Sequence, residues 1–415
     1  MRTLVAALAA TTILATGASA QEGEALSGQL RIFLDTSDPA PRQTMEAVIA
    51  RFGEAHPDLE IETTIIDHEA YKTQIRNFLT ANPPDVAAWY AGNRMRPYVD
   101  AGLFEDVSDL WDEPEIAENL ASTEGALTLD GQQWGVPYTY YQWGVYFRED
   151  LYEEHGVAVP TTFDEMLAGC QTLLDAGIKC FTIGTRVPWT TAGWFDYMNL
   201  RTNGYDFHMQ LTNGEIPWTD ERVRETFANW RQLLDMGAYI DNHTAYTWQE
   251  ALPFMVRGDA AAYLIGNFAV APMREAGLSD DQLGFYQFPA IDPEIPQAED
   301  APTDTLHIPS GAQNKEAARA FLRFVVSPEN QTAINESLGQ LPVNAQAAVA
   351  EDEFLQAGFG MLSEGAPGGI AQFFDRDAPA EMAQIGMESF QEFMVRPDNL
   401  DQILERLEQA RQRVY

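Results

Sequence analysis

Basic side chains are scarce in this sequence, because 25 lysines and arginines stand against 63 aspartates and glutamates in 415 residues. A formal net charge of −38 repels the phosphate backbone of nucleic acids and the surface of anionic membranes. The acidic residues are spread along the chain and form no acidic tail. We therefore expect no nucleic-acid partner and no membrane-surface role, and we attribute the acidity to solubility in a salty environment.

Long apolar runs are also missing after the first twenty residues. No later stretch approaches the ~18 continuous apolar residues that a transmembrane helix requires. The opening stretch MRTLVAALAATTILATGASA has a basic start at Arg2, then an apolar run, then the small-residue motif at residues 18–20. This order is typical of a secretory signal peptide, and no cysteine follows it that could carry a lipid anchor. We expect residues 1–20 to be removed and the mature chain to be exported and soluble, without membrane insertion.

Cysteine occurs only twice, at Cys170 and Cys180, and the six histidines are scattered along the chain. In an oxidising compartment two cysteines this close are more typical of a disulfide than of a metal site. A metal ion would need further histidine or cysteine ligands at short spacing, and none lie nearby. We expect a disulfide, with a pair of free buried thiols as the alternative, and neither a metal site nor a cofactor.

The apolar pattern alternates between strands and helices, and the mature length of about 395 residues favours two domains over one compact core. In the first unit a helix follows each of the first two strands, as in a parallel α/β sheet. Its predicted elements are the strand 29–35, the helix 43–56, the strand 59–66, a helix that contains residues 71–79, and a short strand in PDVAAWYAG. In open sheets of this type, ligands bind at the carboxyl ends of the strands.

A second α/β unit begins near Tyr138. Thr162 and Glu165 have the spacing of a capping box and open an amphipathic helix. The strand KCFTIGT follows, and after its carboxyl end comes TRVPWTTAGWFDYMNL, which holds Trp189 and Trp194. The local pattern of this stretch is compatible both with a buried core and with aromatic faces turned toward a ligand. Its position after a strand favours the second interpretation for the two tryptophans.

An ordered set of motifs then resembles the extracellular solute-binding proteins of carbohydrate ABC transporters, the family that includes maltose-binding protein. The motifs are PPDVAAWYAG, VDAGLFEDVSDLW, LDGQQWGVPYTYYQWGVYFREDLYEEHGVAVPTTFDEML, FMVRGDAAAYLIGNFA, IPSGAQNKEAARAFLRFVVSPENQ and LGQLPVN. The segment from Gly156 to Leu167 is the most specific of them. The later AQFFDRDAPAEM is similar to the alpha-glucoside and glycoside-binding subset.

The resemblance implies an α/β fold of two lobes, each a mainly parallel sheet flanked by helices, with the ligand cleft between lobes that close like a hinge. The N-terminal lobe would comprise residues 27–137 and 266–310, and the C-terminal lobe residues 138–265 and 311–415. The implied function is the high-affinity substrate-binding component of an ABC importer. Such a protein, expected as a periplasmic monomer, would capture an oligosaccharide or glycoside and deliver it to the membrane permease subunits.

A sugar ring presents apolar C–H faces and a rim of hydroxyls, so its site needs aromatic walls together with polar and charged groups. Strand-end positions and the resemblance together give the candidate ligand-binding residues Asp35, Ser37, Trp89, Tyr90, Asn93, Tyr138, Tyr141, Trp189, Trp194, Asn267, Phe268, Asp375 and Arg376. Many family members have tryptophan where this chain has Phe268. We assign Trp111, Trp218, Trp230 and Trp248 to packing, and for Trp143 both roles stay open.

Two other classes of function remain as alternatives. A binding protein for a polyamine, an amino acid or ferric ion could share this fold, and the tyrosines of PYTYY are compatible with an iron site. An exported glycan-active enzyme is the weaker alternative. Acidic pairs carry no information in so acidic a chain, and no nucleophile motif stands out. We therefore expect a binding protein without catalytic residues.

Overall fold

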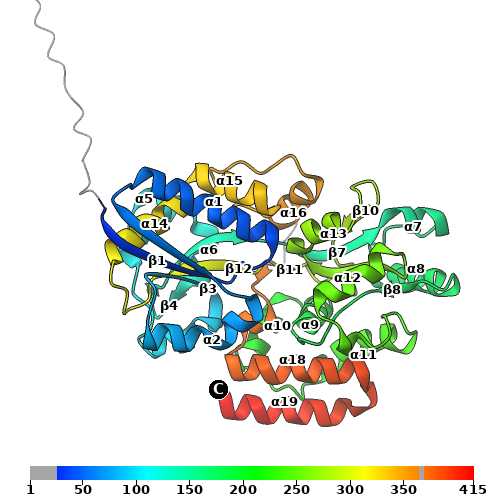
Figure 1. The fold of residues 1–415 in the computed structure, drawn as a ribbon. Helices are drawn as coiled ribbons and strands as arrows, with labels where there is room; N and C mark the ends of the chain where they lie inside the picture. Colours follow the sequence, from blue (N-terminus) through cyan, green and yellow to red (C-terminus); the bar gives the residue numbers. More distant parts are fainter. Residues whose placement is uncertain (1–25, 364–368) are drawn as a thin grey trace, which may run out of the picture.

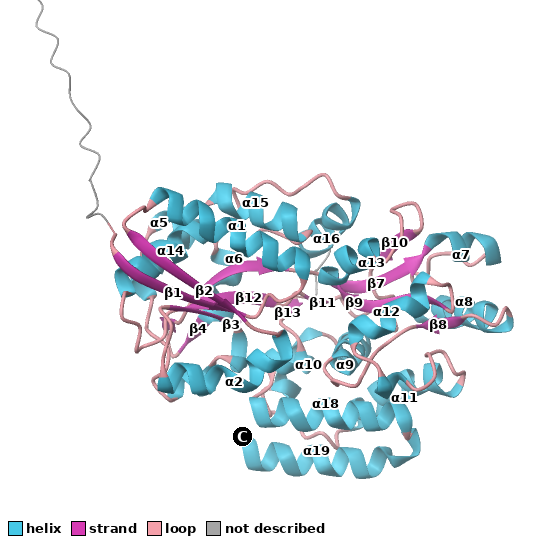
Figure 2. Cartoon of the chain, in the orientation of Figure 1, coloured by secondary structure: helices cyan, strands magenta, loops and turns pink. Residues whose placement is uncertain are grey.

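The computed structural model describes residues 26–363 and 369–415. The predicted signal peptide, residues 1–20, lies outside the described residues. Across the described ranges, no helix has both the length and the apolar character needed to cross a membrane. The described chain forms two lobes that lie side by side, each with a β-sheet between helices (Figures 1 and 2). The predicted two-lobe α/β fold is confirmed.

The first lobe is built on a five-stranded sheet whose strand order is β2-β1-β3-β12-β6. Its strands are β1 (Gly28–Leu34), β2 (Leu59–Ile65), β3 (Val86–Tyr90), β6 (Val136–Tyr140) and β12 (Thr303–His307). β1 pairs in parallel with β2 and β3, as the strand–helix–strand pattern predicts. β12 runs antiparallel to both β3 and β6.

Helices of the first lobe form where the apolar periodicity predicts them. In α1 (Pro39–Ala55) the side chains of Met45, Val48 and Phe52 are buried on one face. In α2 (His68–Ala81) the carboxylate of Asp67 accepts a hydrogen bond from the backbone N–H of Ala70 at 3.0 Å, which satisfies a donor left free at the helix start. The two helices connect β1, β2 and β3 into a parallel unit and bring their carboxyl ends to one edge.

The second lobe has a four-stranded sheet in the order β10-β7-β9-β8. Its strands are β7 (Trp143–Arg148), β8 (Lys179–Phe181), β9 (Ala260–Gly266) and β10 (Leu283–Tyr286). Only the β8–β9 pair is parallel, because β7 runs antiparallel to both β9 and β10. In each sheet a single strand runs against the rest, β12 in the first and β7 in the second, and both enter their sheets directly from the other lobe. The remaining strands share one direction, so the sheets are mainly parallel as predicted.

The lobe boundaries differ from those predicted at the second and third crossings. The hydrophobic core of the first lobe joins residues 30–138 to residues 306–343, and that of the second lobe joins residues 141–288 to residues 354–410. The segment 266–310 was expected in the first lobe, but its strand β10 pairs with β7 of the second. This boundary depends on backbone hydrogen bonds between strands that are far apart in the chain. The spacing of apolar residues within a segment does not indicate such pairing, so the sequence did not predict it.

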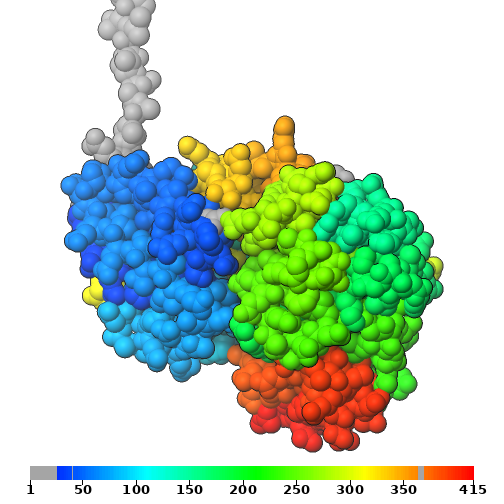
Figure 3. All heavy atoms as spheres, turned by 45° about the vertical axis from the view of Figure 1, so that its right-hand side comes forward, coloured from blue at the N-terminus to red at the C-terminus, as the bar shows by residue number. Residues whose placement is uncertain are grey.

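The third crossing lies later in the chain than residue 310. The helices α14 (Lys315–Val326) and α15 (Pro328–Leu338) bury their apolar faces in the first lobe, where they lie near α1 and the first sheet (Figure 1). The chain then returns to the second lobe and ends in α18 (Ala380–Val395) and α19 (Leu400–Val414). In the space-filling view these last helices form the bottom of the second lobe (Figure 3).

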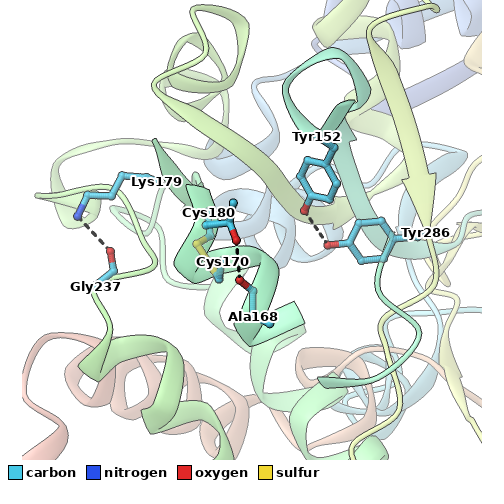
Figure 4. The surroundings of a disulfide bond; sticks show 8 residues. Tyr152, Ala168, Cys170, Lys179, Cys180, Gly237 and Tyr286 are labelled. Carbon is cyan, nitrogen blue, oxygen red and sulfur yellow. Dashed lines mark hydrogen bonds between the residues drawn. A yellow bond between two sulfur atoms is a disulfide. The ribbon is translucent and has the colours of Figure 1, made fainter. Parts of the chain in front are cut away.

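The predicted disulfide is confirmed. Cys170 on α8 (Phe163–Asp175) is bonded to Cys180 on β8, with the two Cα atoms 5.3 Å apart (Figure 4). The predicted capping box at the start of α8 is also present, since Thr162 accepts from the backbone N–H of Glu165 and Glu165 accepts from that of Thr162. The disulfide links α8 to β8, and the loop that follows β8 contains Trp189.

Candidate ligand-binding site

A cavity of about 460 Å³ lies between the two lobes and is lined by both. Cavities of roughly 300–1,000 Å³ bind small molecules in most proteins. The first lobe contributes the loop after β1, the start of α2 and the end of β3, including Asp35 and Tyr90. The second lobe contributes the start of β7, the turn after β9 and the starts of α9 (Thr190–Asn203) and α12 (Trp248–Val256). The space is therefore an interlobe site of the kind predicted.

The second lobe supplies an aromatic wall. Phe268 is its centre, with ring centroids 5.3 Å from Tyr141, 6.2 Å from Trp143, 6.0 Å from Trp189 and 5.2 Å from Trp248. Most of these pairs meet edge to face, the arrangement that aromatic quadrupoles favour. The arrangement holds several flat faces at fixed angles around the cavity, so an apolar ring face of a ligand can stack without the wall having to rearrange.

The first lobe supplies a polar wall in which Asp35 is held by two neighbours. The hydroxyl of Tyr90 donates to its carboxylate at 3.0 Å, and Nδ1 of His68 lies 3.2 Å from the same oxygen. Burial raises the pKa of Asp35, but the hydrogen bond and charge of His68, the hydrogen bond of Tyr90 and the charge of Lys72 outweigh it and lower the pKa. Asp35 therefore stays ionised and can accept hydrogen bonds from ligand hydroxyls.

Arg376 forms part of the cavity floor and is almost fully paired. Its guanidinium donates to the carboxylate of Asp304 at 2.8 Å, to the carbonyl oxygen of Thr303 at 2.7 Å and to the hydroxyl of Tyr141 at 3.1 Å. The same group lies 4.6 Å from the ring centroid of Tyr90. The register of the first sheet explains the pairing, because Asp304 of β12 stands directly opposite Tyr90 of β3.

The short helix α17 (Phe374–Asp377) that carries Arg376 is docked on the first lobe through η1 (Gly92–Arg94). Asn93 donates to the carbonyl oxygen of Asp377 at 2.7 Å, and Arg94 pairs with Asp375. Gly92 has a φ of 70°, and a Cβ at this position would lie 2.7 Å from the carbonyl oxygen of Arg376. This close approach requires glycine and places Asp375 and Arg376 at the cavity.

Two polar groups of the cavity lining have no partner in the described part of the chain. They are the hydroxyl of Thr36 and the indole N–H of Trp143, both buried. Buried polar atoms without a partner are rare in native proteins because they lose the free energy of hydration without replacement. Both atoms are covered by the surrounding protein, so their hydrogen-bonding capacity is not satisfied in this conformation.

Nine of the thirteen predicted site residues line the cavity. They are Asp35, Ser37, Tyr90, Tyr138, Tyr141, Trp189, Phe268, Asp375 and Arg376. They come from six separate parts of the chain, and the pairing of β12 with β3 and the docking of α17 on η1 bring them together. Their role in ligand contact remains a proposal.

The prediction that Trp194 lines the cleft is wrong. This side chain has no exposed area and packs edge to face against Phe181, Tyr239 and Phe288 of the second core. Trp189 is the residue before α9, and Trp194 lies five positions later, roughly 140° further around the helix axis. The two tryptophans therefore point in different directions, one to the cavity and one to the core.

Trp89 also lies in the core, for a related reason. Successive side chains of a strand point to opposite faces, so Tyr90 at the end of β3 lines the cavity while Trp89 turns away from it. The indole N–H of Trp89 donates to the carbonyl oxygen of Arg94 at 3.1 Å, and its ring packs against Tyr98 at 5.2 Å. Trp89 supports the η1 segment and does not line the cavity.

The two predicted asparagines hold the lobes together and do not line the cavity. Asn93 binds α17, as described above. Asn267 is buried, accepts a hydrogen bond from the hydroxyl of Tyr146 at 2.7 Å and donates to the carbonyl oxygen of Gly339 at the end of α15. Both side-chain amides thus donate a hydrogen bond across the boundary between the lobes. In each case the acceptor is a backbone carbonyl oxygen and not a ligand.

Several cavity residues were missed from the sequence. Trp248, assigned to packing, lines the cavity next to Phe268, and so does Trp143, for which both roles were open. Lys72 and His68 on α2 and Asp304 on β12 are further lining residues. Lys72 and His68 lie at the start of a helix that looks solvent-exposed on that side, and Asp304 lies in a stretch that its proline and acid content marks as a loop. No local signal in the sequence distinguishes these residues.

Metal-ligating side chains do not gather at any one place in the described part of the chain. No group of three or more histidine, cysteine or carboxylate side chains there is arranged to hold a metal ion. The cavity instead combines aromatic faces, paired charges and hydrogen-bonding groups, which suits the binding of an organic solute.

Comparison with known proteins supports the same interpretation. Residues 36–332 match the family model for bacterial extracellular solute-binding proteins. An uncharacterised ABC transporter extracellular-binding protein of Pyrococcus horikoshii is 22% identical over 326 residues, which cover 77% of this chain and 72% of that protein.

Two solved structures share the fold over nearly the whole length. The bacterial solute receptor AcbH, described as having an exclusive preference for β-D-galactopyranose, superposes with a TM-score of 0.86 at 24% identity and covers 94% of this chain and 99% of its own. A chitin oligosaccharide binding protein superposes with a TM-score of 0.84 at 19% identity and covers 93% of this chain and 98% of its own. At such identities the likeness establishes the fold.

Proposed function

The chain belongs to the bacterial extracellular solute-binding proteins, and from this premise we propose that it captures a sugar for an ABC importer. Members of this family bind solutes for ABC transporters and are not enzymes, so the chain is a solute-binding component. The proposed ligand is an oligosaccharide or a glycoside, bound with high affinity. In this proposal the protein acts as a monomer in the periplasm, after removal of residues 1–20, and delivers the sugar to the membrane permease subunits.

The observation that carries the proposal is the opposition of an aromatic wall and a polar wall across one cavity. The wall around Phe268 offers flat apolar faces, and the wall around Asp35 offers hydrogen-bond acceptors and donors. A sugar ring has both kinds of surface, with C–H faces that stack on aromatic rings and a rim of hydroxyls that need partners. The sugars named for the two structural neighbours support the same class of ligand.

A thermal-shift screen against mono-, di- and trisaccharides and glycosides tests the proposal. A ligand at about one hundred times its Kd stabilises the folded form by about 2.7 kcal/mol, so even micromolar binders raise the melting temperature measurably. The sugar recovered after binding should be unchanged by mass spectrometry. A screen in which no saccharide shifts the melting temperature, or a recovered sugar that has been cleaved, would contradict the proposal.

A polyamine is the second candidate, because six carboxylates line the cavity: Asp35, Asp38, Asp67, Glu69, Asp304 and Asp375. Putrescine and spermidine therefore belong in the same screen, together with amino acids and ferric ion. A large shift with a polyamine and none with saccharides would replace the sugar proposal by this alternative.

A further inference from the structure

We propose that the cavity admits uncharged saccharides and excludes anionic ones such as sugar acids and sugar phosphates. Asp304 and Glu69 determine this selectivity by keeping the two inner cations, Arg376 and Lys72, paired. The inference rests on the proposed function, because it concerns which saccharides enter the same site.

Arg376 is the first cation that an anionic ligand would need. It is 6% exposed, and its guanidinium already binds Asp304, Thr303 and Tyr141. The ion pair with Asp304 measures 2.8 Å between Nη2 and Oδ1, and both terminal nitrogens are engaged. An incoming carboxylate would have to displace a carboxylate that the sheet register already holds in place.

Lys72 is the second cation and is paired in the same way. Its ammonium donates to the carboxylate of Glu69 at 3.1 Å, one turn earlier on α2, and lies 6.0 Å from the ring centroids of both Tyr90 and Trp189. The side chain is 14% exposed. The third cation of the lining, Arg186, pairs with Glu250 at 2.8 Å, and both side chains are about half exposed.

Carboxylates remain in excess after every cation of the lining is counted. Within the described chain, Asp38 and Asp67 have no cationic partner within 4.0 Å, although both line the cavity. Six carboxylates line the cavity against three lysine and arginine side chains, Lys72, Arg186 and Arg376. The cavity therefore holds a negative potential that its own cations do not cancel.

An anion that enters this space loses its hydration and meets like charge without a free cation to replace the water. An uncharged saccharide loses only hydroxyl hydration, which the carboxylate acceptors of the lining replace. Like-charge contacts across a binding site reduce affinity strongly, so we expect an anionic sugar to bind at least about 100-fold more weakly than its uncharged counterpart.

The test uses matched pairs of probes in which one CH2OH group is replaced by a carboxylate: D-glucose and D-glucuronate, D-galactose and D-galacturonate, and maltitol and maltobionate. Calorimetry measures each pair with the parent protein, Asp304→Asn and Glu69→Gln. Removal of either carboxylate frees a cation. The ratio of the affinity for the uncharged probe to the affinity for the anionic probe should therefore fall about tenfold or more in at least one variant. Asp259→Asn is the matched control, because it neutralises the exposed partner of Arg257, at 2.7 Å, outside the cavity lining; it should leave the preference unchanged.

A second measurement needs no variant. The affinity of the parent protein for an anionic probe should rise between 0.05 and 0.5 M salt, since salt screens repulsion, while that for its uncharged partner stays level. Equal affinities within a pair, an anion affinity that falls with salt, or an unchanged preference in both variants would overturn the inference and leave the sugar proposal standing. Binding of no saccharide at all would overturn the proposed function, and the inference with it.

Discussion

The ammonium group of Lys72 lies 6.0 Å from the ring centroid of Trp189, and the two residues come from opposite lobes. Lys72 belongs to α2 of the first lobe, and Trp189 precedes α9 of the second. A cation near an aromatic ring at this distance contributes about 0.5–2 kcal/mol, depending on its exposure to water. Trp189 is thus part of the aromatic wall and also part of the contact between the lobes, so its removal should affect binding before it affects folding.

Trp189→Ala is predicted to weaken saccharide binding about 10- to 100-fold, because it removes a stacking face worth roughly 1–3 kcal/mol. The melting temperature of the unliganded protein should fall only slightly, since the side chain is partly exposed at the cavity. Calorimetry gives the affinity and a thermal melt gives the stability. Unchanged affinity together with a large loss of stability would show that Trp189 is a core residue.

Trp194→Ala and Trp230→Ala should show the opposite behaviour. Both side chains have no exposed area, and the indole N–H of Trp230 donates to the hydroxyl of Tyr239 at 2.9 Å. Replacement of either is expected to reduce the free energy of unfolding by about 3–5 kcal/mol, with little direct change in ligand contacts. Chemical denaturation of both variants checks this, and a variant of Trp194 with full stability but no binding would restore its predicted role in the cleft.

Gly92→Ala is predicted to weaken saccharide binding through α17. An added Cβ would lie 2.7 Å from the carbonyl oxygen of Arg376, so α17 and its two cavity residues must shift. Gly102→Ala is the matched control, since Gly102 has a similar φ of 65° and a Cβ added there would meet no atom within 4 Å. Both variants should lose about 1–3 kcal/mol of stability from backbone strain. Only Gly92→Ala should lose affinity as well, and equal affinities in the two variants would contradict the docking role.

Asp377 makes stability depend on pH. Burial raises its pKa to about 7, and it lies near Asp196 and Asp300, whose pKa values burial also raises. In the unfolded chain an aspartate titrates near about 3.9. Between these two pKa values the carboxyl of Asp377 is protonated in the folded protein and ionised in the unfolded chain. The free energy of unfolding therefore falls as the pH rises from about 4 to about 7.

The difference between Asp377→Asn and the parent protein isolates this effect. His208, His243 and His307 act in the opposite direction, because burial lowers their pKa values to about 3, 4 and 4, so their contribution is lost as the pH falls below about 6.5. These histidines are present in both proteins and cancel in the difference. Denaturant titrations give the free energy of unfolding of the variant minus that of the parent at each pH. This difference should rise by about 2–4 kcal/mol between pH 4 and pH 8. A difference that stays flat or falls with pH would contradict the buried proton.

The disulfide is expected to stabilise the second lobe without affecting the ligand. Its cysteines are separated by 10 positions, and closing a loop of this length in the unfolded chain contributes about 2–3 kcal/mol in the chain-entropy model. The double variant Cys170→Ala with Cys180→Ala should lose about this much stability. Saccharide affinity should be unchanged, since neither cysteine lines the cavity. Tenfold weaker binding in the double variant would show that the disulfide also positions the Trp189 segment.

The elements of the fold could be predicted because their signals are local. A helix that buries one face repeats its apolar residues every three to four positions, and a strand alternates them, so β1, α1, β2, α2 and β3 lie where periodicity places them. Capping boxes and closely spaced cysteines are local signals as well. The ordered motifs, through their resemblance to a known family, also predicted two lobes with a cleft between them. Nine of the thirteen proposed residues line that cleft.

The lobe boundaries and the choice between neighbouring side chains required the tertiary structure. Whether β10 joins the first or the second sheet depends on backbone hydrogen bonds to β7, more than 130 residues earlier in the chain. Trp189 and Trp194 occupy one short segment with the same composition around them, yet helix geometry turns one to the cavity and one to the core. Asp304 reaches Arg376 only because β12 pairs with β3 in one register and α17 docks on η1. The sequence by itself determined which segments form helices and strands, because that depends on neighbours within a few residues. The tertiary structure decided which side chains meet at the site, because that depends on packing between segments that are far apart in the chain.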